Sequence, residues 1–379
     1  MRILMLNYEY PPLGGGAAPI TQALAEQLAI AGQQVDVLTM GFRGLPAREV
    51  HYDGNLRIMR VPAVRRSMVR AETPEMASYL LAALPVVLAL SRAFRYDLIH
   101  THFLIPTGPL GVTLKAISGL PLVVTIHGSD VPGYNPDRFT QAHRLLQPVW
   151  RQIVHATDAI ITPSAYLGHL LQRSVPTPFH VIPYGFSPPP PVTVTRRQRI
   201  LFASRLFPRK GAHVLLEALA GLDVKDWEVV IAGDGPMLEP LQVQARQLGL
   251  PVVFPGFVRG QALHELYASS AIFVFPSLQD NFPVVLLEAL SHGCAIITNN
   301  CTGMPEVIGP AGLLVPPTDV PALRDALTRL MHDAALRDEL AQRGPQRITE
   351  LRWERIIQAH LALYRQVQPL HNPGNNPSV

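Results

Sequence analysis

Short apolar, strand-like segments alternate with amphipathic, helix-like segments along this chain, and no other feature limits its fold as strongly. Residues 3–6 form an apolar run, and after a Gly/Pro loop Ile20, Leu24 and Leu28 recur every four residues, as on one face of a helix. Residues 35–39 then form a second strand-like run. A strand, a helix and a strand in this order predict a βαβ unit, the repeat of a parallel sheet.

The chain contains two such series, separated by a stiff, proline-rich stretch at residues 187–191. We therefore predict an α/β fold of two Rossmann-like, doubly wound domains, at residues 1–187 and 188–350. A helix over residues 351–367 follows the second domain, and the polar tail at 368–379 is predicted to be flexible. The further predicted strands lie at residues 97–100, 122–126, 159–162 and 180–182, and then at 200–204, 228–232, 252–254, 272–276 and 295–298.

Charge and cysteine content exclude several classes of protein. The formal net charge of +4 is too small to indicate nucleic-acid binding. Cys294 and Cys301 have no zinc-site spacing, and two cysteines are too few for a disulfide framework. The N-terminus lacks the long apolar stretch of a signal peptide, and the apolar segment 79–90, interrupted by Pro85, is too short to span a bilayer. We therefore expect a cytoplasmic protein.

Two cations follow the first strand of the second predicted domain. Doubly wound domains bind ligands at the carboxyl ends of their strands, so a site lies in the cleft if two such edges face each other. Arg205 comes directly after the strand, and Lys210 precedes Gly211 at a helix start. Arginine can grip a pyrophosphate with two hydrogen bonds and lysine as a point charge. The alternative is a solvated basic loop.

Glycine-rich turns follow the first strand of the first predicted domain and the second strand of the second predicted domain. Gly15 and Gly16 end the loop NYEYPPLGGG, where backbone N–H groups can approach an anion near a helix start. The loop is too long for a dinucleotide-binding turn and lacks the GxGxxG spacing, so a plain flexible loop is the alternative. Gly233 begins a tight turn, GDGP, near the same edge of the second domain.

His127 follows the strand at 122–126, so its ring is predicted at the ligand edge of the first domain. There it could donate a hydrogen bond or act as an acid or base. The alternative is a structural histidine capped by Asp130. His100 and His102 follow a neighbouring strand and are predicted to shape the cleft.

The run from residue 276 to residue 305 is the most informative part of the sequence. Asp280 lies before a predicted helix and Glu288 lies within it, and carboxylates suit sugar or ribose hydroxyls. The backbone at 281–284 opens that helix, so its free N–H groups are predicted to face the ligand. Glu288 has apolar neighbours on both sides and needs a partner, unless it is a surface residue.

With these motifs together, the sequence resembles the family 4 glycosyltransferases of the GT-B fold over residues 1–367. The segments that carry the resemblance, in the family's order, are YPPLGGG, DLIHTH, VVTIHGSD, PSAY with VIPYG, FASRLFPRKG, IAGDGP, FPGFV, the run from Asp280 to Glu288, and WERI. The resemblance implies two Rossmann-like domains facing across a cleft, with the C-terminal helix crossing back to the first domain. It also implies a retaining hexosyltransferase with a UDP- or GDP-sugar donor, needing no metal and no other cofactor.

The resemblance assigns roles to single residues. It implies that Arg205 and Lys210 bind the donor diphosphate, that Glu288 binds the ribose, and that His127 reaches the donor sugar. Asp280 stands where the family usually has a glutamate near the sugar hydroxyls, and its side chain is one methylene shorter than glutamate. The remaining donor-side residues are Gly15 and Gly16 near the phosphate and acceptor, Gly233 at its turn, Phe257 and Val258 beside the base, and the backbone of Asn281, Phe282, Pro283 and Val284.

The acceptor is less well specified, and a glycan, a lipid-linked molecule and a small molecule all stay open. Arg65, Arg66 and Arg70 form a basic-apolar loop that could meet a membrane surface, or be a plain surface loop. No nucleic-acid partner is expected.

Three other functions compete with this prediction. A nicotinamide-dependent oxidoreductase would need GxGxxG after the first strand and an acidic residue ending the second, and neither is present. A phosphorylase would need a pyridoxal lysine, and an epimerase of the same fold stays open. A non-catalytic sugar-binding relative is disfavoured by Arg205, Lys210 and Glu288.

Overall fold

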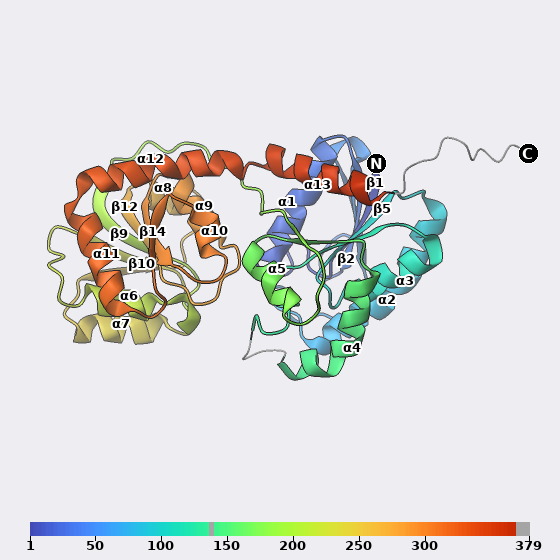
Figure 1. The fold of residues 1–379 in the computed structure, drawn as a ribbon, viewed down its shortest axis with the longest axis horizontal. Coiled ribbons are helices and arrows are strands. Elements are labelled where there is room, and N and C mark those ends of the chain that lie inside the picture. The colour runs from blue at the N-terminus through green and yellow to red at the C-terminus, as the bar shows by residue number, and fades with distance from the viewer. Residues whose placement is uncertain (136–139, 369–379) are drawn as a thin grey trace, which may run out of the picture. The chain divides into compact units, whose positions relative to one another are not determined.

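The computed structural model describes residues 1–135 and 140–368 and divides the chain into two compact units (Figure 1). The first unit consists of Met1–Gly185 together with the chain from Trp353 onward, and the second is Phe186–Arg352. The second unit thus begins at residue 186 and ends at residue 352, whereas the sequence predicted a domain from residue 188 to residue 350. The tail predicted to be flexible lies, beyond residue 368, outside the described residues.

The described part of the first unit is built on an eight-stranded sheet in the order β3-β4-β2-β1-β5-β6-β7-β8. All neighbouring strands are parallel except β3 and β4, which form an antiparallel pair at one edge. The strands are β1 (Arg2–Leu6), β2 (Gln34–Met40), β3 (Arg48–His51), β4 (Leu56–Val61), β5 (Leu98–His102), β6 (Leu122–Thr125), β7 (Ala159–Thr162) and β8 (His180–Val181).

Helices cover both faces of this sheet, because successive side chains of a strand point to opposite faces. Leu4 and Leu6 enter a core with α2 to α5, whereas Ile3 and Met5 enter a core with α1 and α13. The C-terminal helix therefore crosses back to the first unit, as predicted. The helices are α1 (Ala17–Ile30), α2 (Thr73–Ala93), α3 (Gly108–Ser118), α4 (Thr140–Ala156), α5 (Ala165–Gln172) and α13 (Trp353–Val367), with a short 3-10 turn, η1 (Tyr52–Gly54).

The second unit, whose residues are all described, holds a parallel six-stranded sheet in the order β11-β10-β9-β12-β13-β14. Its strands are β9 (Arg197–Ala203), β10 (Glu228–Ala232), β11 (Val252–Gly256), β12 (Ser270–Phe275), β13 (Ala295–Asn299) and β14 (Gly312–Val315). Its helices are η2 (Pro208–Lys210), α6 (Ala212–Leu219), α7 (Leu238–Gln247), α8 (Gln261–Ala268), α9 (Val284–Ser291), α10 (Met304–Ile308), α11 (Val320–His332) and α12 (Ala334–Glu350). The predicted α/β, doubly wound fold class is confirmed.

Strand order marks where each unit binds ligands. In the first unit the order reverses between β1 and β5, and in the second between β9 and β12. A doubly wound sheet holds its ligand at the carboxyl ends of the strands at this switch point. The segments that matter most are therefore the loops after β1, β5, β9 and β12.

The apolar segment 79–90, predicted to be too short to span a bilayer, lies inside the longer helix α2. Helix α2 continues through Pro85, and by length and composition alone it could cross a membrane. Pro85 and Leu81, whose carbonyl loses its helical hydrogen bond to Pro85, both lie on the exposed side, where water can replace that bond. Tyr79, Ala83 and Val87 on the opposite side pack into the core.

Candidate functional site

Lys210 and Asp280 form the centre of the candidate site in the second unit. Lys210 ends the turn η2 that follows β9, and Asp280 lies in the loop that follows β12, so the switch point brings them together. The Nζ atom of Lys210 lies 2.7 Å from each carboxylate oxygen of Asp280. The sequence predicted both residues for the site but did not predict their contact.

Neighbouring hydroxyl groups hold this ion pair in place. Ser277 Oγ donates to Asp280 Oδ2 at 2.6 Å, and Thr302 Oγ1 donates to the backbone carbonyl of Asp280 at 2.6 Å. The side chain of Lys210 is 9% exposed, so burial lowers its pKa, and the nearby carboxylate of Asp280 opposes that shift. The result is a largely desolvated ammonium group with one carboxylate beside it.

Arg205 adds a second, more accessible cation to the same turn. Its side chain is exposed, and its guanidinium carbon lies 5.6 Å from the centre of the Phe207 ring, as does that of Arg209. The turn thus combines a buried ammonium with exposed guanidinium groups. This combination suits a diphosphate, which the exposed guanidinium groups and the buried ammonium group can bind together.

Two glycines allow the loops around this turn to approach one another closely. A Cβ atom on Gly233 would lie 1.8 Å from the carbonyl oxygen of Ser204, and one on Gly211 would lie 2.1 Å from that of Pro276. Both glycines also have positive φ angles, 142° and 78°. Gly233 therefore has a structural role beside the donor-binding role that the sequence predicted for it.

Glu288 on α9 has the partner that its burial requires. Tyr267, fully buried at the end of α8, donates its hydroxyl to Glu288 Oε2 at 2.9 Å. Burial raises the pKa of Glu288, and the hydrogen bond from Tyr267 partly opposes this. The sequence did not identify Tyr267, because its segment, QALHELYA, has mixed polarity and gives no sign of the contact with Glu288.

The remaining residues of the second unit that the sequence predicted for the donor side differ in exposure. Phe282 is buried, while Val284 begins α9, so the first N–H groups of this helix have no partner within it. Phe257 is 68% exposed, and Val258 beside it is half-buried. Such exposure leaves the Phe257 ring accessible to a planar ligand. The predicted roles of Asn281 and Pro283 stay predictions.

His127 lies in the first unit, in a network of hydrogen-bonded rings. Its Nδ1 lies 2.8 Å from the hydroxyl of Tyr184, and its Nε2 lies 3.0 Å from Nδ1 of His102, which ends β5. Burial lowers the pKa of His127 to about 3, so the ring is neutral at physiological pH. Both ring nitrogens have partners, so a sugar could hydrogen-bond the ring only in place of Tyr184 or His102, and the ring supplies no positive charge.

Asp130 orders the turn that carries His127 through backbone contacts. Its Oδ1 accepts the N–H groups of His127 and Gly128 at 3.1 and 3.0 Å, and its Oδ2 accepts that of Leu104 at 2.9 Å. These hydrogen bonds of Asp130 are thus to main-chain groups, while the ring of His127 is held by Tyr184 and His102. The histidine is positioned from both sides.

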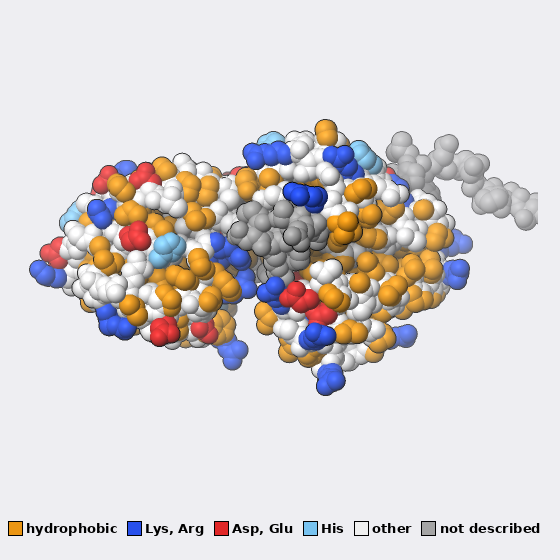
Figure 2. Space-filling model, turned by 90° about the horizontal axis from the view of Figure 1, so that it is seen from below, with side chains coloured by type: hydrophobic (Ala, Val, Ile, Leu, Met, Phe, Trp, Pro, Cys, Tyr) orange, Lys and Arg blue, Asp and Glu red, His pale blue; other side chains and the backbone are white. Residues whose placement is uncertain are grey.

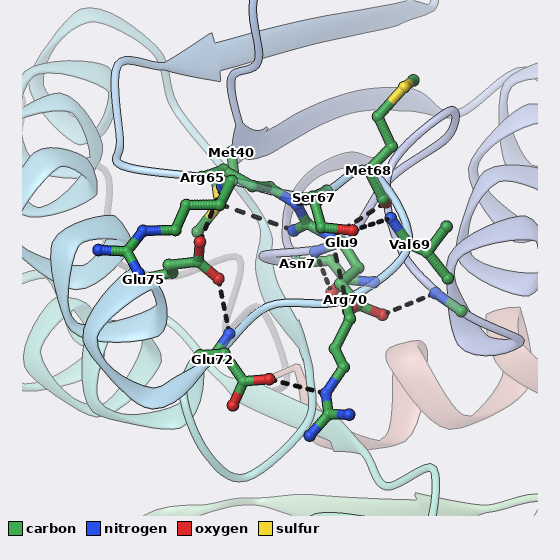
Figure 3. Close-up of polar contacts among 12 residues, drawn as sticks. Asn7, Glu9, Met40, Arg65, Ser67, Met68, Val69, Arg70, Glu72 and Glu75 are labelled. Atoms are coloured by element: carbon green, nitrogen blue, oxygen red, sulfur yellow. Dashed lines mark hydrogen bonds and ion pairs between the residues drawn. The ribbon is translucent and has the colours of Figure 1, made fainter.

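The glycine loop of the first unit is tied to the basic loop that follows β4 (Figure 3). The N–H of Gly15 donates to Glu9 Oε2 at 3.1 Å, and the N–H of Gly14 donates to the carbonyl of Met68 at 2.7 Å. Arg65 also donates to the Met68 carbonyl, at 3.2 Å, and lies 3.9 Å from Glu9 Oε1. The N–H of Gly15, predicted to meet a phosphate, is therefore bonded to a carboxylate here. Gly16 has open space beside its Cα.

The three arginines of the basic loop are not equivalent. The side chain of Arg65 is 0% exposed and points inward to Met40 and Glu9, so it does not form part of the outer surface. Arg66 and Arg70 are exposed, and Arg70 pairs with Glu72 at 2.8 Å. A surface partner can therefore reach Arg66 and Arg70 but not Arg65.

Comparisons with known proteins identify the family of this chain. A family model described as Glycosyl transferases group 1 matches residues 188–347, and one described as Glycosyltransferase Family 4 matches residues 14–188. The chain is 28% identical over 419 residues to a D-inositol 3-phosphate glycosyltransferase of Corynebacterium jeikeium, with 99% of each chain covered.

Two solved structures have a similar fold. One is sucrose-phosphate synthase from Thermosynechococcus elongatus, with a TM-score of 0.80, 24% identity, and 97% of this chain and 99% of that chain covered. The other is HepE from Anabaena in complex with UDP-glucose, with a TM-score of 0.72, 19% identity, and 97% and 100% covered. The two family models together extend from residue 14 to residue 347. The chain therefore belongs to the family 4 glycosyltransferases, has the GT-B fold, and is a transferase enzyme.

Proposed function

We propose that this enzyme transfers a hexosyl group from a UDP- or GDP-sugar to a hydroxyl group of a glycan, lipid-linked or small-molecule acceptor, with retention of the anomeric configuration. The observation that carries the proposal is the contact of Lys210 with Asp280 at the switch point of the second unit. A diphosphate needs a cation and sugar hydroxyls need an acceptor, and these two side chains provide both.

Retention requires the new bond to form on the face from which the nucleotide leaves. The acceptor oxygen bonds to the anomeric carbon while the bond from that carbon to the diphosphate oxygen breaks, and the hydroxyl proton passes to the departing diphosphate. Negative charge develops on the diphosphate during this step, and Arg205 and Lys210 would stabilise it. Glu288 would accept the ribose hydroxyls, and neutral His127 would hydrogen-bond the donor sugar.

The names of two similar proteins support this substrate class. HepE was solved with UDP-glucose, a nucleotide-sugar. The C. jeikeium relative is named for D-inositol 3-phosphate. These names favour a uridine nucleotide as the first donor to test, and they keep small molecules among the acceptors.

A nucleotide panel tests the donor directly. A ligand that binds only the folded protein at about 100 times its Kd adds roughly 2.7 kcal/mol to the unfolding free energy. We therefore expect UDP to raise the Tm in a thermal-shift assay by several degrees and ADP to leave it unchanged, with GDP as the alternative positive result. A flat response to all three nucleotides and to their sugars would contradict the proposed donor class.

We also propose that transfer needs no metal ion or other cofactor, because Arg205 and Lys210 already bring positive charge to the diphosphate. A cytoplasmic location is part of the same proposal. Cys294 and Cys301 are both free thiols, which fits a reducing compartment.

The acceptor side of the proposal includes contact with a membrane surface through the first unit. Figure 2 shows many hydrophobic side chains on one face of the right-hand unit, with basic side chains near its margins. Exposed apolar residues on α2, α3 and α4 are Leu81, Leu84, Ile117, Leu145 and Val149. Exposed basic residues on α4 and in the loop after β4 are Arg144, Arg151, Arg66 and Arg70. Apolar area together with basic charge is what holds a protein at an anionic bilayer.

Liposome flotation tests this contact. We expect the wild-type protein to float with vesicles that contain anionic lipid and to float less at high salt, because salt screens the basic residues. Leu81→Asp should weaken flotation, since Leu81 is 77% exposed and its loss should not disturb the core. Val243→Asp in the second unit, with Val243 38% exposed, is the matched control. Equal flotation of both variants, or no flotation of the wild type, would refute the membrane contact.

A further inference from the structure

A pocket of about 310 Å³ lies in the first unit, at the edge of the sheet formed by β3 and β4. Its lining comes from separate parts of the sequence: Tyr10 in the loop after β1, Glu26 on α1, Tyr52 in the β3–β4 turn, and Arg60 on β4. Ligand pockets begin at roughly 300 Å³, so this one suits a molecule of about the size of a monosaccharide. We call it the Tyr10 pocket.

Two polar atoms lie buried behind the inner wall of the Tyr10 pocket. Tyr10 is 1% exposed, and its hydroxyl has no hydrogen-bond partner among the described residues. Arg60 is 8% exposed, and its Nε has no partner in the same part of the chain. Both atoms are closed off from solvent, so a ligand in the pocket does not reach them, and the polar groups that it can reach include the partly exposed carboxylates of Glu26 and Glu49.

The charges in the pocket favour a neutral or amine-bearing ligand. Glu49 is paired with Arg60 and lies 3.2 Å from His51 Nε2. Glu26 accepts a hydrogen bond from Gln22 at 2.8 Å and has no ion pair among the described residues. Carboxylate oxygens accept hydrogen bonds from hydroxyl or ammonium groups, whereas an anionic ligand would meet the uncompensated charge of Glu26.

Tyr52 forms the outer wall of the pocket, and its backbone has an unusual conformation. Tyr52 and Asp53 have φ angles of 53° and 52°, in the left-handed region that bulky residues such as tyrosine rarely adopt. Tyrosine is strained there, and such strain tends to persist at binding sites. Its ring lines the pocket and is partly exposed. An aromatic face can cover the apolar C–H face of a sugar while the carboxylates accept its hydroxyls.

We propose that the Tyr10 pocket is a second carbohydrate site, separate from the donor site, that binds a neutral or amine-bearing sugar. It also has a physical connection to the glycine loop. Arg60 Nη2 donates to the carbonyl of Pro11 at 3.3 Å, and Tyr10 and Pro11 belong to the same loop as Gly15. A sugar that contacts Tyr10 and Arg60 would therefore affect the position of the glycine loop.

Ligand-observed saturation-transfer NMR on the full chain tests the proposal with D-glucose, D-glucosamine and D-glucuronate as probes. We expect signals from the first two and about tenfold weaker binding of glucuronate, which corresponds to about 1.4 kcal/mol of binding free energy. Tyr52→Gly removes the ring and suits the positive φ, so the variant should fold and should bind glucose about tenfold more weakly. Asp53→Gly relieves the same kind of strain but keeps the ring, and it is the matched control.

The outcomes separate this site from the donor site. Signals that are lost in Tyr52→Gly but kept in both Asp53→Gly and Lys210→Ala support the pocket, whether or not any nucleotide binds. Equal signals in Tyr52→Gly and Asp53→Gly would refute it, and so would signals that disappear in Lys210→Ala. A glucuronate signal as strong as that of glucosamine would contradict the charge argument.

Discussion

Replacing Lys210 with alanine should abolish sugar transfer while the second unit stays folded. Lys210 is the one buried cation at the switch point between β9 and β12 in the fully described second unit that contacts Asp280. A charge that stabilises a leaving group in a desolvated site contributes far more than the same charge in water. By analogy with the loss of one oxyanion-stabilising donor, we expect kcat to fall by about 10²–10³-fold.

The loss of stability that accompanies this substitution can be measured separately. Breaking a buried ion pair leaves an uncompensated charge, and the cost reaches about 3–5 kcal/mol when burial is complete. Asp280 is 18% exposed and keeps the hydrogen bond from Ser277, so the cost should be smaller here. The double variant Lys210→Ala/Asp280→Asn should recover most of the lost Tm, because the neutral amide needs no counter-ion.

The same double variant decides what Lys210 does. Transfer should stay lost when Tm recovers, since both the cation and the carboxylate proposed to hold the sugar are absent. Lys225→Ala is the matched control: Lys225 lies in the same unit with its side chain 88% exposed, and its removal should change neither Tm nor rate. If activity returned together with stability in the double variant, Lys210 would be a structural residue only.

The fold was predictable from the sequence because hydrophobic periodicity follows directly from burial. Parallel strands covered on both faces appear as short apolar runs, and the βαβ repeat then fixes their direction. The antiparallel β3–β4 edge was not predicted, since its strand β3 is mostly exposed and its pattern is not apolar. The full length of α2, which extends beyond residues 79–90 at both ends, was also missed.

The candidate site was predictable only residue by residue. Position after a strand identified Arg205, Lys210 and Asp280, because the carboxyl edge of a parallel sheet is where loops meet ligands. The contact of Lys210 with Asp280 depends on β9 and β12 being neighbours, and strand order cannot be read from periodicity. The inward position of Arg65 beside Glu9 was missed as well, because its basic character suggested a surface position.

Replacing Glu288 with glutamine should make the protein more stable at neutral pH and weaken donor binding. Burial raises the pKa of Glu288 above its ordinary value, so the folded state disfavours the ionised carboxylate. The wild-type protein is therefore fully stable with respect to this group at pH values below the ordinary pKa, and it loses stability as pH rises through the raised pKa. Glutamine stays neutral throughout and can still accept the hydroxyl of Tyr267.

The expected result has two parts that a purely structural role could not produce together. Tm of Glu288→Gln should exceed that of the wild type at pH 7, and the difference should vanish near pH 4, below the ordinary carboxyl pKa of about 4.3. Meanwhile the donor KM should rise about 10–100-fold, because a hydrogen bond to a charged group contributes about 1.5–3 kcal/mol. Glu217→Gln, an exposed position on α6, should change neither quantity. An unchanged donor KM in a stabilised Glu288→Gln variant would remove Glu288 from the donor site, whereas a lower Tm at pH 7 would show that its carboxylate is stabilised in the folded state by a partner stronger than Tyr267.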